Sequence, residues 1–252
     1  MTDLRGRTAL VTGGGSGLGA AIAHSLSRAG ADLVIVGRNA RTLDEVAARL
    51  PGAARALVCD VADEASVSRL RDDLARTEVS ILVNNAGIAG PVASLTDIGV
   101  AEWDEVFAVN VRGTFLMCRA FLPAMVERGA GDVINLASVS GKRPLAHRTP
   151  YTASKMAVIG LTSTLAFEVG PSGVSVNTLS PGPVAGDRMA RNFRLEADRS
   201  ATTPADAEAA FVSRAALARM VTEAEVGAAV VAMLSMSGMC GADIDLSAGM
   251  IA

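Results

Sequence analysis

The sequence predicts an α/β fold in which one doubly wound parallel sheet is flanked by helices. Seven short apolar runs alternate with segments of helical periodicity, which is typical of parallel βαβ units. The first run passes through a glycine-rich turn directly into a helix, as in sheets that bind dinucleotides. The 252 residues contain no internal repeat, low-complexity tract or linker. We therefore expect a single domain over residues 1–252.

The expected elements follow one another in regular order. The strands are expected at residues 8–12, 32–36, 56–59, 80–83, 132–137, 173–179 and 243–246. The helices are expected at residues 20–28, 42–50, 64–75, 103–117, 153–161 and 223–234. Ligands of such sheets bind beyond the carboxyl ends of the strands, so the residues that follow each strand are the first candidates for a site.

The composition describes an aliphatic, weakly acidic chain. Half of the residues are hydrophobic and 3% are aromatic, and the net charge of −3 gives no reason to expect nucleic acid or a membrane surface as a partner. Cys59, Cys118 and Cys240 show neither metal nor disulfide spacing, so we expect no metal site and reduced thiols in a cytoplasmic protein. We expect no signal peptide, and the glycines within residues 226–242 favour a buried helix and turn over a membrane span.

The glycine-rich turn reads Gly-Gly-Gly-Ser-Gly-Leu-Gly over residues 13–19. Glycines let the backbone approach a pyrophosphate, and the N-terminus of the following helix supplies N–H donors and a positive dipole end. A flexible glycine loop is the alternative. The strand before the turn and the helix after it favour dinucleotide binding.

The second strand is followed by Gly37, Arg38 and Asn39. A site for NAD usually carries a carboxylate near this point, which binds the ribose 2′-hydroxyl. A guanidinium instead suits a 2′-phosphate through paired hydrogen bonds. The sequence therefore favours NADP(H), with NAD(H) as the alternative if Arg38 is only a solvated surface residue.

Tyr151, the only tyrosine of the chain, lies four positions before Lys155 at the start of a predicted helix. Residues at this spacing share a helix face. An ammonium beside a phenol favours the phenolate form, so the pair could exchange protons near neutral pH. The spacing alone also arises by chance, so the rest of the chain has to support this interpretation.

These motifs resemble those of the short-chain dehydrogenase/reductase family, and the resemblance covers essentially the whole chain. Thr12-Gly13 followed by Gly17-Leu18-Gly19 matches the TGxxxGxG turn of that family, and residues 84–87 match its Asn-Asn-Ala-Gly motif. The resemblance implies a Rossmann-type fold. It also implies hydride transfer between a nicotinamide cofactor and a carbonyl or secondary alcohol.

The resemblance also implies catalytic roles. Ser138 precedes Tyr151 by thirteen positions, as in the family's catalytic pair, and its hydroxyl would donate a hydrogen bond to the substrate oxygen. Asn110 would hold a water that relays protons from Lys155, although an ordinary helix asparagine is the alternative. Lys155 would also hold the nicotinamide ribose. The expected catalytic residues are Asn110, Ser138, Tyr151 and Lys155.

Cofactor contacts are implied in the same way. Asp60 and Val61 would contact adenine, residues 84–87 would support the sheet beneath the nicotinamide ribose, and the backbone near Val184 would bind the carboxamide. Gly186 stands where the family usually has a threonine that touches the cofactor, so that contact is in doubt. The expected cofactor-binding residues are Gly13, Gly15, Ser16, Gly17, Leu18, Gly19, Arg38, Asp60, Val61, Asn85, Ala86, Gly87, Tyr151, Lys155, Pro181, Gly182 and Val184. A smaller departure is Ser-Ala-Gly at residues 247–249, where the family commonly has Asp-Gly-Gly.

Two segments are expected to bind the substrate. Residues 141–150 form a loop with three positive charges and one histidine, which indicates either a polar or anionic substrate or a solvated basic loop. Residues 186–220 contain a weakly periodic stretch with Arg188, Arg191, Arg194 and Arg199, typical of a mobile segment over an active site or of a plain surface segment. The expected substrate-binding residues are Ser138, Val139, Ser140, His147, Arg148, Tyr151 and Met189.

The sequence therefore predicts an NAD(P)-dependent oxidoreductase that acts on a small polar or anionic substrate such as a sugar, polyol or hydroxy acid. A 3-oxoacyl thioester reductase served by an acyl carrier protein is the alternative within enzymes. A non-catalytic dinucleotide sensor is the alternative outside enzymes, and the four intact catalytic positions argue against it. The resemblance further implies a homotetramer, or a dimer, built through the helices that begin near Trp103 and Tyr151.

Overall fold

The computed structural model describes residues 2–143 and 145–250. Its centre is a seven-stranded sheet in the order β3-β2-β1-β4-β5-β6-β7, with all neighbouring strands parallel. The strands are β1 Thr8–Thr12, β2 Asp32–Gly37, β3 Ala54–Val58, β4 Val79–Asn84, β5 Gly131–Leu136, β6 Val174–Pro181 and β7 Asp243–Leu246. The strand order reverses between β1 and β4, and this arrangement confirms the predicted doubly wound α/β fold.

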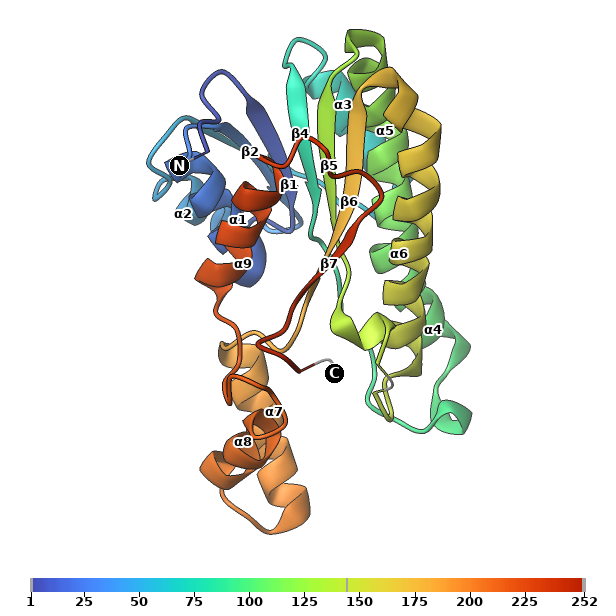
Figure 1. The fold of residues 1–252 in the computed structure, drawn as a ribbon. Helices are drawn as coiled ribbons and strands as arrows, with labels where there is room; N and C mark the ends of the chain where they lie inside the picture. Colours follow the sequence, from blue (N-terminus) through green and yellow to red (C-terminus); the bar gives the residue numbers. More distant parts are fainter. Residues whose placement is uncertain (1, 144, 251–252) are drawn as a thin grey trace.

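Helices cover both faces of this sheet (Figure 1). One face carries α1 Gly17–Arg28, α2 Ala40–Ala47 and α9 Glu223–Met233, and the other carries α3 Glu64–Asp73, α4 Val100–Phe107, α5 Gly113–Arg128 and α6 Thr149–Val169. Successive residues of a strand point to opposite faces. In β1, Val11 accordingly joins the core beneath α1 and α9, whereas Leu10 joins the core beneath α3 and α5.

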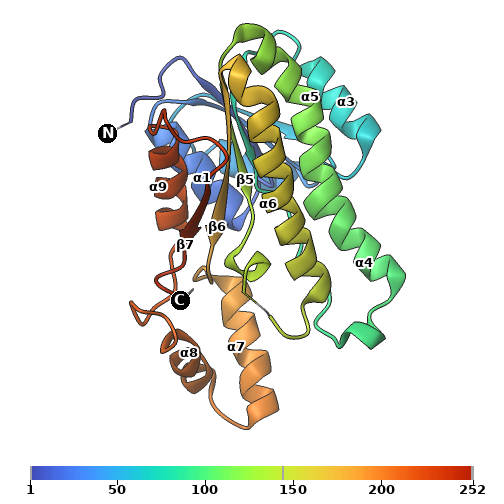
Figure 2. The same ribbon diagram turned by 45° about the vertical axis from the view of Figure 1, so that its right-hand side comes forward.

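Two helices stand apart from these layers. α7 Asp187–Ser200 and α8 Pro204–Val212 form a hairpin beyond the end of β6, below the sheet in both views (Figures 1 and 2). The buried residues Met189, Phe193 and Ala197 form one stripe of α7, and the Phe193 ring meets that of Phe211 at 5.5 Å. The sequence shows only weak periodicity over residues 187–219 because this segment contains two short helices and the turn between them instead of one continuous helix.

The predicted helix over residues 103–117 is wrong in its bounds and in its regularity. α4 begins three residues earlier, where the Glu102 carboxylate accepts a hydrogen bond from the Gly99 N–H. A π-helical turn, Ala108–Arg112, follows, and α5 then continues to Arg128 through Pro123. π turns of this kind often mark functional sites, and this one carries Asn110.

Other element boundaries also differ. α6, Thr149–Val169, begins four residues before the expected residue 153 and ends eight residues after the expected residue 161. α2 begins at Ala40 and not at residue 42, because the Asn39 side chain accepts a hydrogen bond from the Thr42 N–H and caps the helix. It ends at Ala47, before the expected residue 50. β6 runs two residues further than expected, to Pro181. The three cysteines are free, and none of the described helices has the length and apolar character needed to cross a membrane.

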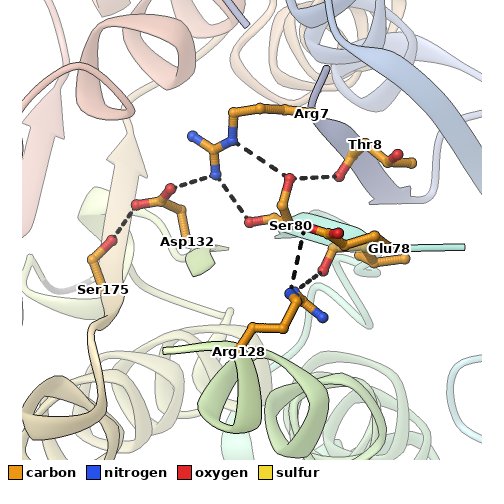
Figure 3. Close-up of polar contacts among 8 residues, drawn as sticks. Arg7, Thr8, Glu78, Ser80, Arg128, Asp132 and Ser175 are labelled. Atoms are coloured by element: carbon orange, nitrogen blue, oxygen red, sulfur yellow. Dashed lines mark hydrogen bonds and ion pairs between the residues drawn. The ribbon is translucent and has the colours of Figure 1, made fainter. Parts of the chain in front are cut away.

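Polar side chains tie the strands together near the amino end of β1 (Figure 3). The Arg7 guanidinium donates to an Asp132 carboxylate oxygen at 2.6 Å and to the Ser80 carbonyl at 3.0 Å. Arg128 donates to the Val79 carbonyl at 2.9 Å. These contacts join β4, β5 and α5 to the residue that precedes β1. They lie at the amino ends of the strands, opposite the carboxyl ends, and they hold the strands and α5 together.

Candidate active site

The turn after β1 and the turn after β4 are joined by hydrogen bonds. The Thr12 hydroxyl oxygen accepts from the Asn85 and Ala86 N–H groups, each at 2.9 Å, and the Asn85 amide donates to the Thr12 carbonyl at 2.9 Å. A Cβ on Gly19 would stand 2.1 Å from the Gly13 carbonyl oxygen, so only glycine fits where the turn meets α1. The Thr-Gly turn and the Asn-Asn-Ala-Gly motif therefore form one rigid floor.

This floor is suited to a dinucleotide. The Ser16 side chain makes no capping hydrogen bond to α1, and the first turn of α1 carries no acidic residue, so the helix leaves N–H donors available for a phosphate. A cleft of about 760 Å³ opens above the turn. Every residue predicted from the sequence to bind the cofactor lines this cleft.

The cleft is also lined by residues that are not among those predicted to bind the cofactor or to act in catalysis. These are Gly37, Asn39, Thr42, Leu43, Ile88, Val109, Leu136, Ala137, Ala185, Gly186 and Glu223. Most of these residues are neighbours in the chain of a residue that the sequence predicts for the site. They line the cleft because they belong to the same turns. Glu223 is different, because it comes from the start of α9 and belongs to no motif.

Lys155 is held at the centre of the site. Its side chain is 5% exposed, and its ammonium donates to the Leu136 carbonyl, at the end of β5, at 2.7 Å. The same ammonium lies 5.8 Å from the centre of the Tyr151 ring. The two residues therefore share a face of α6, as their spacing predicts, with a fixed positive charge beside the phenol.

The Asn110 side chain is fully buried and connects three parts of the site. Its amide oxygen accepts from the Ile88 N–H at 2.8 Å, and its amide nitrogen donates to the Ile88 carbonyl and to the Ser154 hydroxyl, both at 3.0 Å. Both amide hydrogens are thus engaged in fixing the segment after Gly87 against α6. The water-holding role of Asn110 stays a prediction.

Ser138 lies where β5 gives way to a short 3-10 turn, Val139–Gly141. Its hydroxyl oxygen accepts from the Ser140 N–H at 3.2 Å, so its own hydrogen can be donated elsewhere. A Cβ on Gly141 would lie 3.1 Å from the Met156 nitrogen. The turn therefore packs closely on α6, which brings Ser138 to the same cleft as Tyr151.

A second cavity of about 880 Å³ lies between the Ser138 turn and the α7–α8 hairpin. Every residue predicted to bind the substrate lines it, together with apolar side chains of the hairpin and the loops. Three residues, Ser138, Tyr151 and Gly182, line both cavities. A cofactor in the first cavity and a substrate in the second would meet at these residues.

The charges of the loop 142–148 are distributed differently from the prediction. The Lys142 ammonium pairs with Asp243 at 2.8 Å and with Asp245, and the Arg143 guanidinium donates to the Met250 carbonyl at 2.6 Å. Burial lowers the pKa of Lys142, but the hydrogen bonds that its ammonium donates to the two carboxylates outweigh that effect and raise the pKa above its usual value. Two of the three loop charges therefore hold residues 243–250 in place.

The rim of the second cavity is fixed by backbone contacts. His147 adopts a left-handed conformation with φ of 62°, unusual for a residue with a Cβ. Its carbonyl accepts from the Ala93 N–H at 3.1 Å, which joins the loop after β4 to the loop before α6. Arg191 and Arg194 are exposed and do not line the cavity. Arg188 and Arg199 lie outside the side chains that the structure describes, as does Pro144.

Comparison with protein families identifies the chain. Residues 7–197 match the family model described as short chain dehydrogenase. The chain belongs to the short-chain dehydrogenase family. It is 43% identical over 183 residues to D-threitol dehydrogenase of Mycolicibacterium smegmatis, covering 71% of this chain and 70% of that protein. It is 46% identical over 187 residues to galactitol 2-dehydrogenase (L-tagatose-forming) of Cereibacter sphaeroides, covering 72% and 73%.

Solved structures of short-chain dehydrogenases match nearly the whole chain. NAD⁺-bound xylitol dehydrogenase superposes with a TM-score of 0.91 at 28% identity, over 98% of this chain and 99% of that one. An actinorhodin polyketide ketoreductase variant with NADPH superposes with a TM-score of 0.92 at 28% identity, over 99% of both chains. The protein is thus an oxidoreductase of a family that binds nicotinamide dinucleotides, and the two relatives differ in which one they hold.

Proposed function

We propose that this short-chain dehydrogenase interconverts a secondary hydroxyl group of a polyol or sugar and the corresponding ketone, with NADP(H) as its preferred cofactor. The proposal depends above all on Ser138, Tyr151 and Gly182, which line both the dinucleotide cleft and the second cavity. The two curated relatives act, by their names, on the polyols threitol and galactitol. A polyol also suits a cavity that exposes hydroxyl and charged side chains beside its apolar wall.

The residues of the cleft would hold the cofactor at both ends. Residues 13–19 and the start of α1 would bind the pyrophosphate, and Arg38 would bind a 2′-phosphate. Lys155 would bind the nicotinamide ribose. When bound, the nicotinamide accepts a hydride from the alcohol carbon or gives one to the ketone carbon.

The protein's own groups would handle the proton. The Ser138 hydroxyl would donate a hydrogen bond to the substrate oxygen and hold it next to the Tyr151 phenol. In oxidation the phenolate form of Tyr151 would take the hydroxyl proton, and in reduction the phenol would return it. The Lys155 ammonium, fixed by the Leu136 carbonyl, favours the phenolate by its charge. Asn110 would lie on the path that connects this proton to water.

The cofactor preference depends on the end of β2. Arg38 is exposed and lines the cleft beside Asn39 and Thr42 at the start of α2. The cleft-lining residues at this end include no carboxylate apart from Asp60, whose side chain accepts from the Ala62 N–H at 3.0 Å. A phosphate would therefore meet a guanidinium and a helix N-terminus here, both of which favour an anion.

The test is a fluorescence titration of cofactor-free protein with NADPH and, separately, with NADH. We expect tighter binding of NADPH. Arg38→Ala should lose about ten- to a hundredfold in NADPH affinity, the usual effect of removing charge-assisted hydrogen bonds, and little in NADH affinity. Equal losses for both dinucleotides, or a preference of the unaltered protein for NADH, would contradict the proposed preference.

A second candidate is reduction of a 3-oxoacyl thioester. The apolar wall of the second cavity, formed in part by Leu145, Phe193 and Phe211, favours a longer carbon chain than a tetritol offers, and the ketoreductase with NADPH shares the fold. Comparing kcat/KM for a series of polyols with that for 3-oxoacyl thioesters separates the two candidates. A polyol should give the higher value if the first proposal holds.

A further inference from the structure

The Glu223 carboxylate lies against the glycine-rich turn. Glu223 is the first residue of α9, and its side chain is half-buried. One of its carboxylate oxygens, Oε1, stands 3.6 Å from the point where a Cβ on Gly17 would be, and 3.6 Å from the same point on Gly186. It therefore reaches both the start of α1 and the start of α7, and it lines the dinucleotide cleft.

Among the side chains that the structure describes, none forms an ion pair with this carboxylate. The charged residues among those that line the cleft are Arg38, Asp60, Lys155 and Glu223. Lys155 is bound to the Leu136 carbonyl, and the nearby Arg219 is paired with Glu225 at 2.7 Å. The ion pairs found in the described part of the chain do not include Glu223.

The position matters because the start of α1 is where a pyrophosphate would bind. α1 has no acidic residue in its first turn and no side-chain cap from Ser16, so its positive end is open to an anion. Glu223 brings a negative charge to that end from a different element. In the free protein this contact is favourable, and a bound pyrophosphate would face a carboxylate at close range.

We infer that Glu223 weakens the binding of the nicotinamide dinucleotide by electrostatic repulsion of its pyrophosphate, and so promotes cofactor release. The inference rests on the proposed dinucleotide site and goes beyond it. It assigns Glu223 the opposite effect from the other cleft residues, which bind the cofactor. Because Gly186 has no side chain, the Glu223 carboxylate can occupy the space next to it.

The test is the affinity of purified full-length protein for NADPH in the Glu223→Gln variant. We expect the dissociation constant to fall by about three- to tenfold at low ionic strength, on the order of the effect of one unit charge a few ångströms away in a highly polar medium. At about 1 M salt, where the screening length is about 3 Å, the gain should largely disappear. Glu127→Gln is the matched control, because Glu127 is exposed on α5 and does not line the cleft. It should show no comparable gain.

Weaker or unchanged NADPH binding in Glu223→Gln would overturn the inference, because the carboxylate would then be a ligand of the cofactor or a bystander. A gain that persists unchanged at high salt would also overturn it, since the cause would be steric. If Glu223→Gln does not fold, Glu223→Asp, which keeps the charge but withdraws it, should give a smaller gain. If neither the unaltered protein nor any variant binds a dinucleotide, the proposed function fails instead.

Discussion

Tyr151 reaches both cavities from the first turn of α6, with the Lys155 ammonium 5.8 Å from its ring. Among the described residues, two hydroxyl-bearing side chains line both the dinucleotide cleft and the second cavity, and Tyr151 is one of them. Ser138 is the other, and its hydroxyl oxygen is already oriented by the Ser140 N–H. The chemistry that we propose therefore depends on a small number of atoms at the junction of the cavities.

Replacing the phenol removes the proton carrier and little else. Tyr151→Phe should lower kcat by about 10²–10⁴, the usual contribution of a positioned acid–base group, while NADPH still binds. Stopped-flow turnover and a fluorescence titration measure the two effects separately. Near-normal turnover in this variant would show that another group moves the proton.

That the candidate catalytic residues Ser138, Tyr151 and Lys155 lie together could be predicted from the sequence, because they are close to one another along the chain. Ser138, Tyr151 and Lys155 belong to one strand–turn–helix unit, so their spacing is a local property. Glu223 and Met250 could not be predicted in the same way, because they reach the cavities from segments far along the chain. Their places depend on how α9 and residues 243–250 dock, which no local pattern encodes.

At the scale of elements, the helix that carries Asn110 differs most from its prediction. The sequence predicts a helix at residues 103–117, but it does not predict the π-helical turn at Ala108–Arg112. Within that turn, the Asn110 amide forms hydrogen bonds with Ile88 and Ser154, which are distant in the sequence. The sequence does not predict the continuation to Arg128, because Pro123 interrupts the pattern that is typical of a helix.

The N-terminus of α9 should be sensitive to acid. The Arg219 guanidinium and the Thr222 N–H donate to the Glu225 carboxylate and hold its pKa at about 2, below its usual 4.5. A carboxyl group whose pKa is lowered by folding stabilises the folded state above its unfolded pKa. This stabilisation is lost as pH falls from about 4.5 toward about 2.

We therefore expect Glu225→Gln to lower the Tm at neutral pH, with the difference from the unaltered protein shrinking as the pH falls below about 4.5. Thermal denaturation followed by circular dichroism over a pH series measures this difference. A difference that stays constant down to the lowest pH would show that the carboxylate's charge does not stabilise this helix. Glu127→Gln serves as a control for the change in net charge.

At the scale of the whole molecule, two cores lie on either side of one sheet, and the outer faces of α5 and α6 remain open. Phe167 is 85% exposed, and Phe115 and Met156 on the same pair of helices are also exposed. The two helices lie side by side on one face of the protein (Figure 2). Apolar side chains of this size on adjacent helices favour contact with another subunit.

We expect a tetramer, or a dimer, of the 25.7 kDa chain that is built through α5 and α6. Phe167→Glu should shift the assembly to smaller species, because it places a charge in the contact. Light scattering coupled to size-exclusion chromatography measures the mass. Leu217→Glu is the control, since Leu217 is also exposed but lies between α8 and α9. A monomeric unaltered protein would contradict the expectation.

Lys142 and Arg143 make contacts with residues that are synthesised much later than they are. Their partners Asp245 and Met250 follow them in the chain by 103 and 107 residues. During translation the loop before α6 therefore leaves the ribosome long before the segment that anchors it exists. A nascent chain can already contain Ser138, Tyr151 and Lys155 before Met250, which lines the second cavity together with Arg143, has been synthesised. We therefore expect the second cavity to acquire this part of its lining only after β7 has been synthesised and has paired with β6 at the edge of the sheet.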